Sequence, residues 1–241
     1  MSVNGTINPT SGTPIVPGGV RLLTIGEIAL ARTLFGESII YSKVWVHRES
    51  YLPFNLQPVD IAMTPNGELW FREGTYSPDF SLDILEKKHR FMHEMVHAWQ
   101  AQKGMFVRTR GLFSRFADYS YSLDKADFLH YGLEQQASIA SDYWLIQAFG
   151  LNRDTYALVK YRNLNSNDSI HSILSIYKSV MKGGLAPIFP YTFYHLTHYW
   201  FAAADIPVAN DTPVHYADAI RCNVRRPPQG SLPLLTRRVS A

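Results

Sequence analysis

Residues 93–97 read His-Glu-Met-Val-His, and this H-E-x-x-H pattern limits what the chain can fold into more than any other feature. The surrounding residues 81–103 have the character of one continuous helix, in which positions four apart lie on the same face. The imidazoles of His93 and His97 would therefore point the same way and could bind one metal ion. Glu94 would lie beside that ion. The pattern predicts a zinc site of the kind that hydrolyses amides.

Signals at both ends of this helix support the prediction. Ser81 is a candidate N-cap, and Asp83 would place a negative charge in the first turn. Gly104 follows at the position expected for a stop. Apolar residues recur three or four positions apart and predict a buried stripe: Leu85, Met92, Val96 and Trp99, with Met95 beside it. The two histidines fall on a neighbouring face, as expected for the wall of a cleft.

A catalytic zinc ion usually has three protein ligands and leaves its fourth position to water. The pattern with a nearby third histidine is excluded, because Gln100 and Lys103 occupy the places of its glycine and histidine. A glutamate from a later helix is the other common solution. Glu134 is the only glutamate in the sequence after His97, so a glutamate ligand has to be Glu134.

The segment around Glu134 is predicted to be a second helix, because apolar residues recur there at helical spacing: Leu133, Ala137, Ala140 and Tyr143. Asp142 in the same segment is the alternative ligand. We favour it instead as an acceptor that orients a ligand histidine. Three further alternative ligands lie in a predicted loop: Asp118, Asp124 and Asp127.

These roles define an expected mechanism. Glu94 accepts a proton from the water that attacks a carbonyl carbon, and passes it to the leaving nitrogen. A nearby donor would stabilise the oxyanion, and the sequence offers several without choosing among them: Tyr119, Tyr121, His195, His198 and Tyr199. The last three belong to an aromatic cluster that could equally pack in a core. His89, one turn before His93, is expected to be exposed or to support a ligand.

The 241 residues are expected to form one domain with a sizeable core. We predict a flexible lead-in over residues 1–20, the domain over 21–220 and a flexible basic tail over 221–241. The net charge of +3 is too diffuse to predict nucleic-acid binding. Cys222 is the only cysteine, which excludes an intrachain disulfide and a cysteine-based zinc site.

The sequence contains no stretch of 18 apolar residues, so no membrane span is expected. Its first 19 residues lack the basic start and the apolar core of a secretory signal. We therefore expect a protein made in the cytoplasm. If it acts outside its cell, it should leave by a route that does not read such a signal.

Residues 61–71 are predicted to form a β-hairpin, because proline and glycine in 64–67 stand at positions typical of a turn. An edge strand beside a cleft can hold an extended peptide by backbone pairing. This hairpin is our candidate for such an edge.

The other elements follow from caps and alternation. Thr24 and Glu27 form a capping box for a helix over residues 25–34, and residues 42–47 alternate as a strand does. Further helices are predicted at 169–182 and 190–204. A small sheet followed by helices predicts an α+β domain.

The motif at 93–97, combined with a helix-borne Glu134, resembles the gluzincin group of zinc metallopeptidases. In many gluzincins an aspartate follows the third ligand by four residues. Here Ser138 stands at that position and Asp142 comes later, so the contacts that support the ligands cannot be transferred from that group.

A closer resemblance is to the metallopeptidase domains of Vgr-related proteins, which accompany or extend the spike proteins of bacterial type VI secretion systems. Three stretches carry it, 63–67, 93–100 and 132–140, within a region of roughly residues 20–150. The resemblance implies a zincin-like fold and one zinc ion per chain on His93, His97 and Glu134.

The same resemblance implies a toxin-like effector that hydrolyses peptide bonds in the periplasm or cytosol of a target cell. Its expected partners are a peptide or protein substrate, a VgrG-type spike protein and an immunity protein. Two other functions fit the motif. One is an amidase that cleaves peptidoglycan stem peptides, and the other is a zinc-stabilised spike adaptor without turnover.

Overall fold

The structure is a computed structural model that describes residues 15–105, 118–165, 167–182 and 184–185. These residues all belong to one compact unit of the chain. The predicted helix at 190–204 and the predicted tail lie outside the described residues, as do three of the candidate oxyanion donors: His195, His198 and Tyr199.

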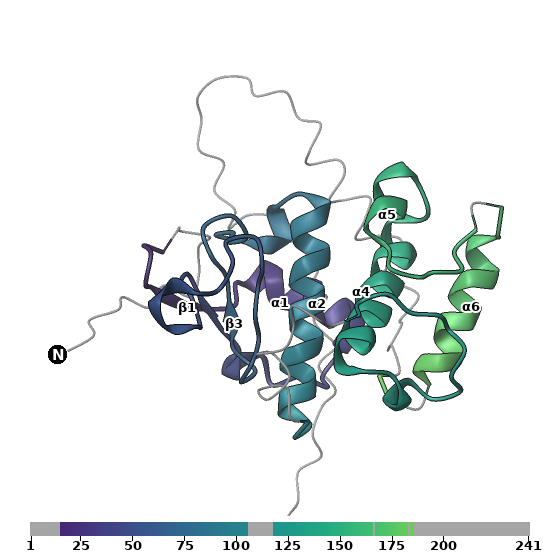
Figure 1. The fold of residues 1–241 in the computed structure, drawn as a ribbon, viewed down its shortest axis with the longest axis horizontal. Helices are drawn as coiled ribbons and strands as arrows, with labels where there is room; N and C mark the ends of the chain where they lie inside the picture. Colours follow the sequence, from purple (N-terminus) through teal and green to yellow (C-terminus); the bar gives the residue numbers. More distant parts are fainter. Residues whose placement is uncertain (1–14, 106–117, 166, 183, 186–241) are drawn as a thin grey trace, which may run out of the picture. The chain divides into compact units, whose positions relative to one another are not determined.

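The described part combines a three-stranded sheet with several helices, which confirms the predicted α+β class (Figure 1). The sheet has the order β1-β2-β3, with β1 at Val20–Leu22, β2 at Trp45–His47 and β3 at Leu69–Trp70. β1 runs antiparallel to β2, whereas β3 runs parallel to it. Strands of two or three residues are too short for alternation to reveal, which is why β1 was not predicted.

The predicted strand at 42–47 and the predicted hairpin at 61–71 are both present in shortened form. Tyr41–Lys43 forms a 3₁₀ helix before β2. In the hairpin, Met63 and Trp70 exchange two backbone hydrogen bonds of 3.1 and 2.8 Å. Gly67 has a φ of +86°, and a Cβ there would lie 3.1 Å from Cβ of Ala101, so glycine lets the turn close against a helix.

The described residues contain five α-helices: α1 at Ile25–Phe35, α2 at Leu85–Gln102, α4 at Leu133–Phe149, α5 at Arg153–Leu158 and α6 at Ile170–Met181. The capping box of α1 forms as predicted, and α6 confirms the helix predicted at 169–182, with Ser169 as its N-cap. α5 was not predicted. No helix among the described residues is long and apolar enough to cross a membrane.

The start of α2 lies four residues later than predicted. Phe80–Leu82 forms a short 3₁₀ helix, η3, whose N-cap is Asp79. The backbone N–H and the hydroxyl of Ser81 both donate to the Asp79 carboxylate, so Ser81 cannot cap α2. Ile84 takes the N-cap position without a side-chain hydrogen bond. The prediction of Ser81 as N-cap was wrong because Asp79 competes for it.

α2 runs through the middle of the described part and packs most extensively on α4 (Figure 1). The predicted stripe on α2 is buried from Met92 to Trp99, and Leu85 is partly buried. In Figure 1, β3 and α4 lie on opposite sides of α2, so this helix separates the sheet from the later helices.

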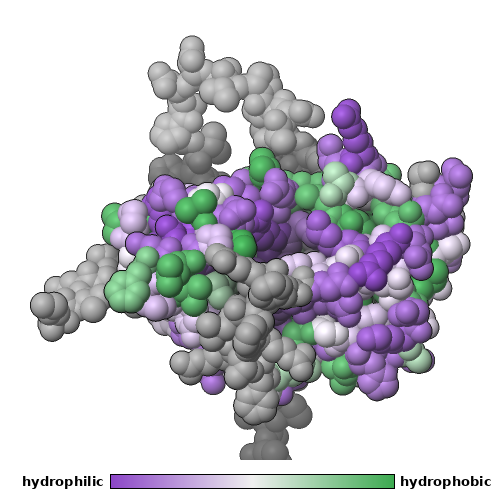
Figure 2. Space-filling view, viewed as in Figure 1, coloured by the Kyte–Doolittle hydropathy of each residue, from purple (hydrophilic) through white to green (hydrophobic). Residues whose placement is uncertain are grey.

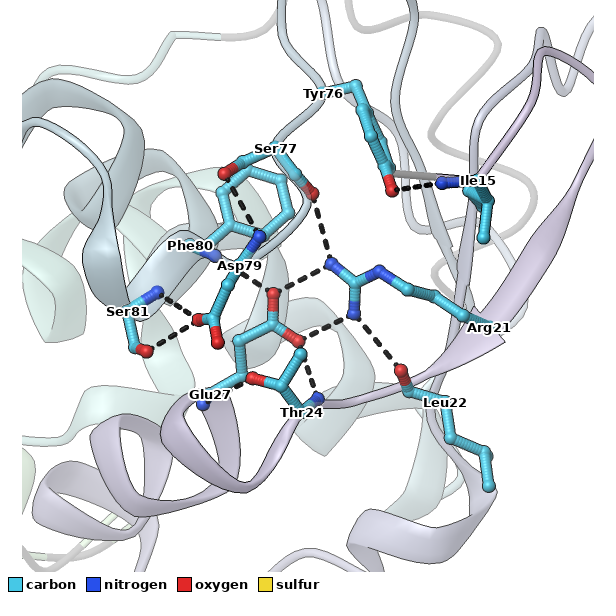
Figure 3. Close-up of polar contacts among 10 residues, drawn as sticks. All are labelled: Ile15, Arg21, Leu22, Thr24, Glu27, Tyr76, Ser77, Asp79, Phe80 and Ser81. Atoms are coloured by element: carbon cyan, nitrogen blue, oxygen red, sulfur yellow. Dashed lines mark hydrogen bonds and ion pairs between the residues drawn. The ribbon is translucent and has the colours of Figure 1, made fainter. Parts of the chain in front are cut away.

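A buried ion pair joins the sheet to the first helix and to η3 (Figure 3). Arg21 of β1 donates to both carboxylate oxygens of Glu27, at 2.7 and 2.8 Å. Glu27 also accepts from the backbone N–H groups of Thr24 and Phe80, and Arg21 also donates to the carbonyl of Ser77. Because both charges are buried and hydrogen-bonded, loss of either one would leave the other uncompensated. The network fixes the segment that leads into α2.

Candidate metal centre

Three side chains from two helices converge on one point. His93 and His97 lie on α2, Glu134 lies in the first turn of α4, and one possible ligand atom of each is within 4.8 Å of the others. The Nε2 atoms of His93 and His97 are 3.2 and 3.1 Å from the same oxygen of Glu134. The spacing of four residues aligns the rings, and the packing of α4 on α2 brings the carboxylate opposite them.

The charges at this point suit a cation. Burial by itself would lower the pKa of His97, but the charge and hydrogen bond of Glu134, with the charge of Glu94, raise it to about 9. Burial would raise the pKa of Glu134, yet the two histidines outweigh it and lower that pKa. Two imidazoles and a carboxylate with converging atoms are a donor set that zinc takes, so the residues present fit this metal.

Gln100 holds His97 in place. Its Oε1 lies 2.7 Å from Nδ1 of His97, and its Nε2 donates to the carbonyl of Leu133 and to the side chain of Gln136. With Nδ1 engaged in this way, Nε2 of His97 faces Glu134. The sequence did not predict this role for Gln100, which stands where the pattern with a nearby third histidine has glycine. Its place on the same face as His97, three residues later, was the available signal.

Glu94 lies next to the ligand cluster and is 6 % exposed. Its Oε2 accepts a 2.7 Å hydrogen bond from the hydroxyl of Thr64, which follows Met63 in the hairpin. The turn after Thr64 packs on α2, so the hairpin positions the carboxylate of Glu94. No local sequence pattern predicts this contact, because it depends on how the hairpin packs on α2.

Asp142 contacts neither His93 nor His97. It is fully buried and accepts from Nε2 of His89, the hydroxyl of Tyr121 and the backbone N–H of Lys160, at 2.8, 2.6 and 2.6 Å. It lies eight residues beyond Glu134, or about 12 Å along α4. That distance carries it past His93 to His89, one turn nearer the start of α2. The expectation that Asp142 orients a ligand histidine is therefore wrong, while His89 lies beside the site and is held by Asp142.

The other alternative carboxylates are engaged elsewhere. Asp118 pairs with Arg162, and Asp127 caps a 3₁₀ helix through the N–H of Leu129. Asp124 interacts with Tyr131. None of them belongs to the described cluster around His93.

The two candidate tyrosines lie in different environments. The ring of Tyr119 is centred 5.9 Å from that of His93, and burial, with the charges of Glu134 and Glu94, raises the pKa of Tyr119. It therefore keeps its proton and can donate a hydrogen bond. Tyr121 is buried in the network of Asp142, and its hydroxyl also contacts that of Tyr177. Tyr119 is thus the described candidate donor that lies at the site.

A cavity of about 380 Å³ surrounds the cluster. Residues 60–65 form one wall, and α2 contributes both histidines and Glu94. The lining is completed from other segments, chiefly by Tyr119, Glu134, Ser138, Leu158 and Lys160. The cavity therefore brings His93, His97, Glu134 and Glu94 together in one lining.

No family model matches the chain. The type VI secretion system spike protein VgrG2b of Pseudomonas aeruginosa is 39 % identical over 133 residues, covering 52 % of this chain. The chain spans only 13 % of the length of that protein. The solved effector domain of VgrG2b is 34 % identical, with a TM-score of 0.48, over 61 % of this chain and 82 % of that domain. Sequence identity carries the relationship, and it shows that the chain is a homologue of the VgrG2b effector domain and belongs to the same family.

Proposed function

We propose that this chain is a zinc-dependent metallopeptidase of zincin-like fold that acts as a type VI secretion effector. The observation that carries the proposal is the convergence of His93, His97 and Glu134 in a cavity, with Glu94 beside them. Metal-assisted amide hydrolysis requires a ligand set of this kind together with an adjacent carboxylate that is not itself a ligand.

The protein groups divide the work of the reaction. A zinc ion held by His93, His97 and Glu134 would supply Lewis-acid polarisation of a carbonyl and activation of water. Glu94 accepts the proton of the attacking water and passes it to the leaving nitrogen. The hydrogen bond from Thr64 holds the Glu94 carboxylate in its orientation. Tyr119 retains its proton and donates a hydrogen bond to the developing oxyanion.

The cavity wall favours a peptide substrate. Both backbone groups of Met63 pair with Trp70, so those of Ala62 and Thr64 point to the opposite side in an antiparallel arrangement. Residues 61–65 line the cavity, and an extended peptide could add to this edge as another strand. The edge is the 61–63 segment rather than β3, because β3 is paired on both sides.

The homologue suggests how the protein reaches its target. VgrG2b is a type VI secretion system spike protein, and this chain is related to its effector domain. We propose delivery with a VgrG-type spike protein into the periplasm or cytosol of a target cell, with an immunity protein that protects the producer.

The test uses the purified chain loaded with zinc and two variants. Wild type should cleave a denatured protein and hold one zinc per chain. Glu94→Ala should keep the zinc and lose activity, because Glu94 is the base and not a ligand. Glu134→Ala should lose both. Full activity in Glu94→Ala would overturn the proposal, and release of muropeptides from sacculi without proteolysis would replace it with the amidase function.

A further inference from the structure

We propose that the loop Pro53–Val59 is a substrate-docking surface that extends the cleft wall. It selects polypeptide substrates that place an apolar side chain on this loop, outside the cavity. This inference rests on the proposed peptidase function and names its substrate class. Three side chains form the surface, which we call the apolar rim: Phe54, Leu56 and Val59.

All three side chains of the apolar rim are largely exposed to solvent. Phe54 is 93 % exposed, Leu56 is 63 % exposed and Val59 is 57 % exposed, all within six residues. Each exposed apolar side chain forgoes a burial free energy of about 1.5–3 kcal/mol, and clusters of them mark interaction surfaces. Figure 2 shows green surface at the left of the view, over the dark-blue segment of Figure 1.

The loop that carries the apolar rim is held in place. The buried side chain of Gln57 accepts from the N–H of Tyr51 and donates to the carbonyls of Ile61 and Trp70. Arg72 donates to the carbonyl of Gln57 and to that of the residue at position 55. The loop is therefore tied to both strands of the hairpin that forms the cleft wall, and its side chains are presented at a fixed place.

The backbone at the tip is strained. Phe54 and Asn55 have φ values of +54° and +58°, in the left-handed region. Asn tolerates this region, but for Phe it costs on the order of 1–2 kcal/mol. A glycine would relieve the strain, and the Phe54 side chain contributes little to folding because it is almost fully exposed. The combination fits a side chain whose partner is another molecule.

The apolar rim is continuous with the proposed peptide-binding edge. Val59 directly precedes Asp60, where the cavity wall begins, and Arg90 of α2 holds the carbonyl of Asp60. A peptide strand advances about 3.3 Å per residue. A chain paired along residues 61–65 and running toward Asp60 would reach Val59 within two or three residues. A short polar stem peptide would end inside the cavity, whereas a polypeptide would cross the apolar rim.

The experiment measures peptide binding without turnover, in zinc-loaded Glu94→Gln protein. Ten-residue fluorescent peptides carry one Leu, or one Ser in its place, at successive positions. A triple variant replaces the apolar rim: Phe54→Ser, Leu56→Ser and Val59→Ser. A control triple variant changes exposed apolar residues far along the chain: Leu129→Ser, Ile170→Ser and Ile176→Ser. Thermal unfolding checks that each variant is folded.

We expect the rim variant to bind the best Leu peptide about tenfold more weakly, and the Ser peptides as before. The control should bind both as the parent protein does. Unchanged Leu-peptide binding in the folded rim variant would overturn the inference, and so would a loss confined to association with a spike protein. If the Glu94→Gln protein binds no peptide and the wild-type protein cleaves none, the proposed function is wrong, and the inference that rests on it is wrong as well.

Discussion

The hydrogen bond between Thr64 and Glu94 gives the sharpest prediction at the scale of single residues. Thr64→Val keeps the shape of the side chain and removes the 2.7 Å bond to the carboxylate. Hydrogen bonds to charged groups contribute about 1.5–3 kcal/mol, so we expect kcat to fall ten- to a hundredfold. KM and zinc content should stay the same. Thr64→Ser should restore most of kcat, and an unchanged kcat in Thr64→Val would show that Glu94 needs no such support.

Gln100 allows a second test at the same scale. Gln100→Leu removes the partner of Nδ1 of His97 and frees its ring to rotate. Because partners of ligand histidines typically contribute ten- to a hundredfold to metal affinity, the zinc Kd should rise by about that factor. Competition with a fluorescent chelator measures it. An unaltered Kd would mean that Glu134 alone orients the ring.

Asp142 of α4 provides the prediction at the scale of secondary-structure elements. Its carboxylate joins α4 to α2 through His89, to the segment before α4 through Tyr121 and to the segment before α6 through Lys160. Asp142→Asn places an amide against three donors and should lower the free energy of unfolding by about 2 kcal/mol. Zinc content should not change, because Asp142 does not touch the ligands. Urea denaturation with metal analysis decides the matter; loss of zinc at unchanged stability would contradict this assignment.

What the sequence could predict at this scale follows from how far apart the interacting residues are. The cap of α1 by Thr24 and the helix around Glu134 depend on neighbours within a few residues, and both predictions are confirmed. The start of α2 was predicted too early, because Asp79 accepts the hydrogen bond of Ser81, the residue expected to cap the helix. The parallel pairing of β2 with β3 depends on residues more than twenty positions apart, and no local pattern encodes it.

The same reasoning applies to the candidate site. The spacing of His93 and His97 is fixed by helix geometry, and Glu134 followed from the absence of any other later glutamate. The contacts of Gln100 and Thr64 depend on how α4 and the hairpin pack on α2, so they became visible only in three dimensions.

At the scale of the whole molecule, the buried pair of Arg21 and Glu27 holds the sheet, α1 and η3 together. Arg21→Met would leave a buried carboxylate without its partner, and we expect a loss of about 3–5 kcal/mol in the free energy of unfolding. Adding Glu27→Gln should recover part of that loss, because the uncompensated charge is then removed. Chemical denaturation of the single and double variants measures both, and equal stability of the two would refute the charge argument.

Zinc should also control the stability of the whole molecule. The candidate ligands join α2 to α4, the most extensive helix contact of the described residues, so the metal can bind tightly only when these helices are packed. A ligand specific for the folded state stabilises it by about 2.7 kcal/mol at a hundred times its Kd. The unfolding temperature should therefore rise with free zinc and fall on chelation. Glu134→Ala should unfold at one temperature whatever the zinc concentration, because Glu134 is the proposed ligand on α4 and the two histidines both lie on α2. If the wild-type protein binds one zinc ion per chain but its unfolding temperature does not change with zinc concentration, then zinc binds somewhere other than between α2 and α4.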